Sequence, residues 1–105
     1  MWGLVGSSCE VHYSTAKAGL IGMTKALAKE LGPSGITVNA IAPGVIDTNM
    51  NASLSAEIID ALIEETPVSR IGLPEDVAEA ALFLAGDGAG FITGEVLNIS
   101  GGFVV

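Results

Sequence analysis

Two short apolar segments, far apart in the sequence, constrain the fold of this chain more than any other feature. The first, GITVNAIAPG at 35–44, is a β-branched run closed by Pro-Gly, and it predicts a buried strand at 36–42. The second, GEVLNIS at 94–100, has the same character. More than fifty residues of mostly helical chain separate the two. Because parallel strands need a long crossover and antiparallel strands do not, the sequence predicts an α/β fold with a parallel sheet.

The strand at 36–42 is apolar almost throughout, which is typical of a strand with a neighbour on each side. Two strands are too few to form a sheet buried on both faces. We therefore expect the chain to hold only part of a sheet, with a further partner of this strand lying outside it.

Three segments have the periodicity of helices. Residues 12–31 end at Gly32-Pro33, residues 54–65 turn acidic side chains toward water, and Pro74 stands at the first turn of a helix at 74–86. The predicted order is helix, strand, helix, helix, strand. The apolar stripe expected on the first helix is Ala16, Leu20, Met23, Leu27 and Leu31.

The charge of the chain excludes several classes of partner. Its 105 residues carry a net charge of −8 with only four Lys and Arg, so we expect neither nucleic acid nor an anionic membrane as a partner. No apolar run approaches the length of a membrane span. Cys9 is the only cysteine and has no metal-binding pattern around it, so we expect no disulfide, no metal site and a reducing, cytoplasmic compartment.

Tyr13 stands four residues before Lys17 on the first predicted helix, a spacing that places the two side chains one turn apart. Helical geometry turns Lys17 to within ~40° of the packed side, whereas Lys25 and Lys29 fall on the far side. A cation one turn away would favour the phenolate and suit the tyrosine to acid-base work on an alcohol or carbonyl. A core tyrosine beside a solvated lysine is the other interpretation, and this helix alone leaves both open.

Two longer stretches carry a resemblance: YSTAKAGLIGMTKALAKELGPSGITVNAIAPGVIDTNM, then RIGLPEDVAEAALFLAGDGAGFITGEVLNISGGFVV. Together they resemble the short-chain dehydrogenase/reductase family, in its 3-oxoacyl-carrier-protein-reductase-like branch, over essentially all of residues 1–105. The resemblance implies the C-terminal part of a Rossmann-type, doubly wound parallel sheet with flanking helices, and NAD(P)H-dependent reduction of a carbonyl to an alcohol. It makes 12–32 the catalytic helix and 52–70 the substrate lid of a single domain.

The resemblance also assigns site residues. Tyr13 would be the catalytic acid/base, and Lys17 would hold the nicotinamide ribose while lowering the pKa of the tyrosine. Pro43 and Gly44 would close over the nicotinamide ring, and the backbone of Ile46 would meet its carboxamide. The hydroxyl of Thr48 would contact the carboxamide or the pyrophosphate. The cofactor-binding set is therefore Tyr13, Lys17, Pro43, Gly44, Ile46 and Thr48.

Other parts of the family pattern do not occur in this sequence. The Gly-rich turn that seats the pyrophosphate should leave a strand and open a helix, and GDGAG at 86–90 does the opposite. The family's catalytic serine would fall immediately before Met1, and Ser7 and Ser8 lie too close to Tyr13 to replace it. We therefore expect the C-terminal half of a reductase, inactive alone and unable alone to bind NAD or NADP. The alternative is a non-catalytic remnant or association module.

Two features bear on substrate and assembly. The start, WGLVGSSCEVHYS, is similar to a Gram-positive branch that reduces a 5-aminopentanone group on elongation factor P, so the expected substrate is a small or protein-tethered carbonyl compound. Small residues form a further face of the first helix, where the family dimerises, so we expect a homo-oligomer at full length. These residues are Ala18, Gly19, Gly22 and Ala26.

Overall fold

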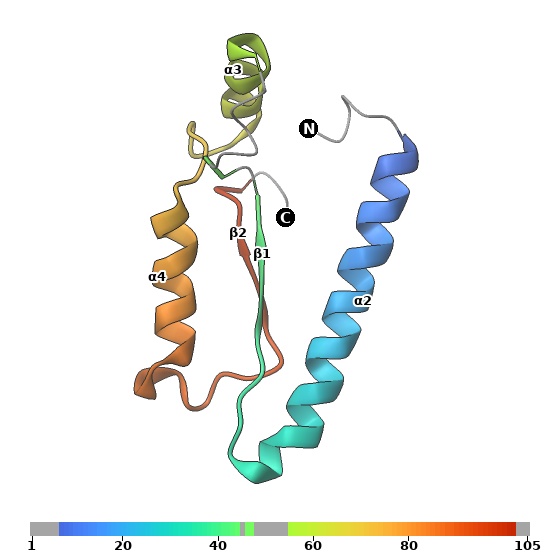
Figure 1. Cartoon of the computed structure of the whole chain (residues 1–105), viewed down its shortest axis with the longest axis vertical. Helices are drawn as coiled ribbons and strands as arrows, with labels where there is room; N and C mark the ends of the chain where they lie inside the picture. Colours follow the sequence, from blue (N-terminus) through green and yellow to red (C-terminus); the bar gives the residue numbers. More distant parts are fainter. Residues whose placement is uncertain (1–6, 45, 48–54, 103–105) are drawn as a thin grey trace. The chain divides into compact units, whose positions relative to one another are not determined.

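The computed structural model describes residues 7–44, 46–47 and 55–102, with 7–13 as backbone only (Figure 1). Its elements follow the predicted order of helix, strand, helix, helix and strand, with two short 3₁₀ turns between them. They are α2 (Ser7–Leu31), η1 (Gly32–Ser34), β1 (Ala40–Pro43), α3 (Ala56–Glu65), α4 (Pro74–Ala85), η3 (Asp87–Ala89) and β2 (Val96–Ile99).

The two strands pair with each other, as Figure 1 shows. The Ala40 amide donates to the Glu95 carbonyl at 2.8 Å, and the Gly44 amide donates to the Ile99 carbonyl at 2.9 Å. Both bonds join residues at the same offset along the sequence, which is the register of parallel strands. The predicted α/β class with a parallel pair of strands is confirmed.

The first strand begins at Ala40, later than in the predicted strand at 36–42. Before Ala40, hydrogen bonds from side chains take the place of the backbone bonds between the strands. Asn39 donates from Nδ2 to the Ile92 carbonyl at 3.0 Å and accepts from the Glu95 amide at Oδ1 at 3.1 Å. The Val38 amide donates to Oγ1 of Thr93 at 2.9 Å. The two chains are therefore held together over this stretch without forming regular strand.

Two compact units make up the chain. The first spans 1–40 and 90–96, and the second spans 41–89 and 97–105. Helix α2 belongs to the first unit and ends at Leu31, where the sequence places its stop at Gly32-Pro33. Both strands run from the first unit into the second.

The buried face of α2 differs from the predicted stripe. Thr24 and Ala28 are its buried residues, at 3% and 7% exposure, whereas Met23 is 57% exposed and Ala16 is also exposed. The Thr24 hydroxyl donates to the Leu20 carbonyl at 2.6 Å, so burial leaves this polar group satisfied. The prediction was wrong at Ala16 and Met23, because the packed face of α2 follows the line of Thr24 and Ala28.

The second unit contains α3 and α4. Helix α3 begins at an N-cap, Ser55, whose hydroxyl oxygen accepts from the Ile58 amide at 3.2 Å, and it buries Leu62 to 1% exposure. Helix α4 begins at Pro74, as predicted, because proline at the first position lacks only an amide that the helix cannot use. No helix in the described ranges is long and apolar enough to cross a membrane.

Candidate active site

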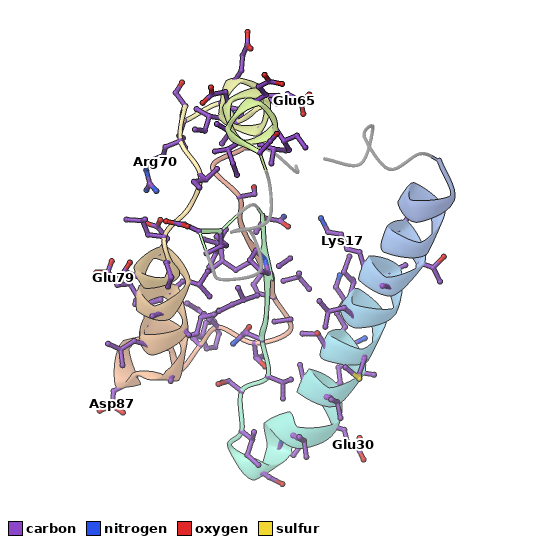
Figure 2. The ribbon with its side chains drawn as sticks, turned by 45° about the horizontal axis from the view of Figure 1, so that its top comes forward. Lys17, Glu30, Glu65, Arg70, Glu79 and Asp87 are labelled. Atoms are coloured by element: carbon purple, nitrogen blue, oxygen red, sulfur yellow. The ribbon has the colours of Figure 1, made fainter. Side chains whose placement is uncertain are left out.

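The first group of candidate residues lies on α2, in the first unit. Tyr13 is in the helix four residues before Lys17, and the Lys17 side chain extends from the same helix (Figure 2). Lys17 is half-buried, whereas Lys25 and Lys29 are exposed. The predicted direction of Lys17, toward the packed side of α2, is thereby confirmed.

The second group follows β1, in the second unit. Gly44 passes so close to the chain after β2 that a Cβ on it would lie 2.9 Å from Cα of Ser100. Carbon atoms at ordinary contact are ~3.5–4.0 Å apart, so only glycine fits here. Pro43, at the end of β1, is exposed.

Ile46 continues from this turn and forms an isolated parallel bridge with Gly72, in the loop between α3 and α4. The next amide, on Asp47, donates to the Gly72 carbonyl at 2.8 Å. The same loop is also bonded to the chain after β2, because the Val68 amide donates to the Gly101 carbonyl at 3.1 Å. The loop therefore contacts the chain that follows each strand.

These segments surround a cavity of about 400 Å³ within the second unit. Its wall combines the end of β2 with the α3–α4 loop and the start of α4, and it includes the ion pair between Arg70 and Asp76. The lining residues are Ile46, Val68, Arg70, Gly72, Asp76, Leu97, Asn98, Ile99, Ser100 and Gly101.

Arg70 and Asp76 form a forked ion pair between this loop and the first turn of α4. Nη1 and Nη2 of Arg70 donate to the two carboxylate oxygens of Asp76 at 2.8 and 3.2 Å. The Leu73 amide donates to the same carboxylate at 2.7 Å. The bonds from Arg70, and then the bond from Leu73, lower the pKa of Asp76 to about 2, and the pairing raises the pKa of Arg70. Figure 2 shows Arg70 on the loop between the two helices.

The family model described as enoyl-(acyl carrier protein) reductase matches residues 2–104 of this chain. The chain belongs to the short-chain dehydrogenase/reductase family. Among solved structures, it is similar to a 3-oxoacyl-[acyl-carrier protein] reductase from Brucella melitensis, with a TM-score of 0.83 and 42% identity. That match covers 90% of this chain and 35% of the other. A short-chain dehydrogenase/reductase from Serratia marcescens gives a TM-score of 0.81 at 43% identity, over 89% and 38% of the two chains.

Curated relatives agree with this assignment. The chain is 51% identical to the 3-oxoacyl-[acyl-carrier-protein] reductase FabG of Chlamydia trachomatis over 100 residues, 95% of this chain and 40% of the relative. It is 45% identical to YmfI of Bacillus subtilis, named an uncharacterized oxidoreductase, over 103 residues, 98% of this chain and 43% of the relative. The chain therefore spans about two fifths of the length of these relatives. Its fold is part of the Rossmann-type α/β fold of short-chain dehydrogenases/reductases.

Within this short-chain dehydrogenase/reductase chain, the predicted site residues fall into both units. Tyr13 and Lys17 lie in the first, and Pro43, Gly44 and Ile46 lie in the second. Thr48 lies outside the described residues. The structure brings Ile46 to the cavity wall, and the roles that the resemblance assigns to all six stay predictions.

Sequence reasoning did not single out Arg70 and Asp76. The signal for Asp76 was present, because an acidic residue two places after Pro74 can reach back to the amide before the helix. Nothing in the sequence indicated that Arg70 would fold back onto the same carboxylate. Among the described residues, no three His, Cys, Asp or Glu side chains gather closely enough to hold a metal ion.

Proposed function

We propose that the protein carrying this chain reduces a carbonyl to an alcohol with NADPH or NADH, and that α2 supplies its acid/base. The observation that carries the proposal is the half-buried Lys17, one turn after Tyr13, on a helix whose other two lysines are exposed. Its intermediate exposure turns Lys17 toward the packed face of α2, and a cation one turn after a tyrosine is the arrangement that suits acid-base chemistry on a carbonyl.

Reduction of the carbonyl to an alcohol requires the transfer of one hydride and one proton. When bound, the reduced nicotinamide supplies the hydride to the carbonyl carbon. Tyr13 holds the proton at its hydroxyl and gives it to the carbonyl oxygen as the alcohol forms. Lys17 stabilises the phenolate that remains, because a cation one helical turn away favours the charged form of tyrosine.

The residues from Pro43 onward fit a nicotinamide in their chemistry. Pro43 offers an exposed apolar ring, and Gly44 lets the turn that follows it lie close against Ser100. Backbone groups of Ile46 would bond the carboxamide, the hydroxyl of Thr48 would bond the carboxamide or the pyrophosphate, and Lys17 would donate to ribose hydroxyls. The Gly-rich pyrophosphate turn and the choice between NAD and NADP would come from the rest of the protein.

Two substrate classes fit. A 3-oxoacyl thioester on a carrier protein is the first, by analogy with FabG relatives at about half identity. A ketone that carries an amine is the second, and the charge of α3 favours it. Within the proposed lid at 52–70, α3 has four acidic residues and no basic one, which suits a cationic substrate and repels an acidic carrier.

Consumption of NADPH at 340 nm tests the proposal, with a 3-oxoacyl thioester and an aliphatic amino ketone as substrates. The exposed lysine on the same helix provides a matched control: we expect Lys17→Met to lower kcat/KM by at least ~100-fold and to weaken cofactor binding, and Lys25→Met to leave both within twofold. Equal rates for the two variants, or no consumption of NADPH with any carbonyl, would contradict the proposal. The alternative of a non-catalytic remnant or association module would then remain.

Self-association is part of the same proposal. The small-residue face of α2, formed by Ala18, Gly19, Gly22 and Ala26, is exposed, and a Cβ built on either glycine meets nothing within 4 Å. A second helix could therefore approach α2 closely. We expect Gly22→Leu to lower the mass measured by light scattering, and an unchanged mass would place the interface elsewhere.

A further inference from the structure

The bond from Asp47 to Gly72 depends on a single peptide group. That group joins Gly72 to Leu73, so the Gly72 carbonyl and the Leu73 amide are its two ends. The carbonyl accepts from the Asp47 amide at 2.8 Å, and the amide donates to the Asp76 carboxylate at 2.7 Å. Because a peptide group is planar and trans, fixing the direction of the N–H also fixes the direction of the C=O.

Arg70 fixes the adjoining peptide group in the same way. Its Nη1 donates to the Ile71 carbonyl at 3.1 Å while the guanidinium holds both oxygens of Asp76. The ion pair is therefore hydrogen-bonded to the peptide groups on both sides of Gly72: Arg70 donates to the Ile71 carbonyl, and Asp76 accepts from the Leu73 amide. Hydrogen bonds aligned through one peptide polarise each other, which strengthens the bond to Asp47.

The segment that receives this bond is the one assigned to the cofactor. Ile46 and Asp47 follow Pro43-Gly44 after one intervening residue, and they are joined to Gly72 by the parallel bridge and by the bond from the Asp47 amide. Gly44 is anchored separately, by its bond to Ile99 on β2. The α3–α4 loop therefore contributes to the direction of the chain beyond Gly44.

We propose that Arg70 and Asp76 are positioning residues that hold the Ile46–Asp47 backbone in place through the Gly72–Leu73 peptide. The link to the cofactor rests on the proposed function, in which Ile46 meets the carboxamide. The positioning of the Ile46–Asp47 backbone by the ion pair does not depend on that function. Asp76 acts through its carboxylate, and Arg70 acts by orienting that carboxylate and the Ile71 carbonyl.

Hydrogen exchange at the Asp47 amide, measured by NMR on the ¹⁵N-labelled chain without cofactor, tests the proposal. Asp76→Ala removes the acceptor of the Leu73 amide, and we expect Asp47 exchange to rise about tenfold. Asp76→Asn keeps an oxygen that can accept this bond but loses the ion pair, so an increase of about threefold is expected. The Gly44 amide, bonded to β2 in the same unit, should keep its rate in both variants.

Glu75 provides the matched control, because it is an exposed carboxylate in the same first turn of α4. Glu75→Ala removes the same charge from the same helix end and should leave Asp47 exchange unchanged. An unchanged Asp47 rate in Asp76→Ala would overturn the proposal, as would an equal rise at Asp47 and Gly44 in Asp76→Asn. Since no cofactor is present, failure here would leave the proposed function standing, and failure of the proposed function would leave this result standing.

Discussion

Replacing Gly44 with alanine tests the close approach between the chains that follow β1 and β2. The added Cβ would lie 2.9 Å from Cα and 3.0 Å from Cβ of Ser100. To reach an ordinary carbon–carbon contact of ~3.5 Å, the segments that follow β1 and β2 must separate by about 0.5 Å. The 2.9 Å bond from the Gly44 amide to the Ile99 carbonyl opposes that movement.

The expected loss follows from these two effects. Overpacking against backbone destabilises by about 1–3 kcal/mol, and stretching the hydrogen bond removes about 1 kcal/mol. The lower entropy of the unfolded alanine chain offsets up to about 1 kcal/mol. We therefore expect the free energy of unfolding to fall by about 1–3 kcal/mol.

Equilibrium unfolding in urea, followed by circular dichroism, measures this loss. Gly88→Ala is the matched control in the same unit, because a Cβ there meets nothing within 4 Å and the backbone does not have positive φ. It should leave the unfolding free energy unchanged or raise it slightly. If Gly44→Ala were as stable as Gly88→Ala, the close packing of Gly44 against Ser100 would be refuted.

Three further predictions concern single contacts. Arg70 lowers the pKa of Asp76 to about 2, so the pair contributes its full stability above about pH 4 and loses that contribution as the pH falls through 2. The urea midpoint of Asp76→Asn should therefore lack the decrease that this pair causes between about pH 4 and pH 2. Asn39→Ala removes both bonds from its amide to segment 92–95 and should lower the unfolding free energy by about 2 kcal/mol, whereas a loss under 0.5 kcal/mol would mean that the amide is dispensable. Ser55→Ala removes the N-cap of α3 and should lower stability by about 1 kcal/mol, with increased amide exchange in the first turn; unchanged exchange would contradict the cap.

The helices could be predicted because they depend on local patterns, and the parallel pairing of the strands could be predicted from the long helical crossover between them. Proline and glycine mark the end of α2 and the start of α4, and apolar periodicity marks the rest. The exposure of Lys17 relative to Lys25 also followed from helical geometry alone. These features need no knowledge of what each element packs against.

The features that could not be predicted depend on contacts between distant segments. The first strand starts at Ala40 because the Asn39 amide bonds to a segment more than fifty residues away. Met23 is exposed because the packed face of α2 is the one that carries Thr24 and Ala28. The pairing of Arg70 with Asp76 requires a loop conformation that no periodicity encodes. The site residues themselves came from resemblance to the family, since Tyr-x-x-x-Lys spacing is weak evidence alone.

The central claim is that Tyr13 gives the proton during reduction of a carbonyl. Tyr13→Phe removes one hydroxyl and keeps the ring, so comparing its steady-state NADPH consumption with that of the unaltered protein isolates the proton. We expect kcat to fall by about 100- to 10,000-fold while the dissociation constant for NADPH changes less than threefold. A Tyr13→Phe protein that reduces the same substrate within threefold of the original rate would contradict this claim.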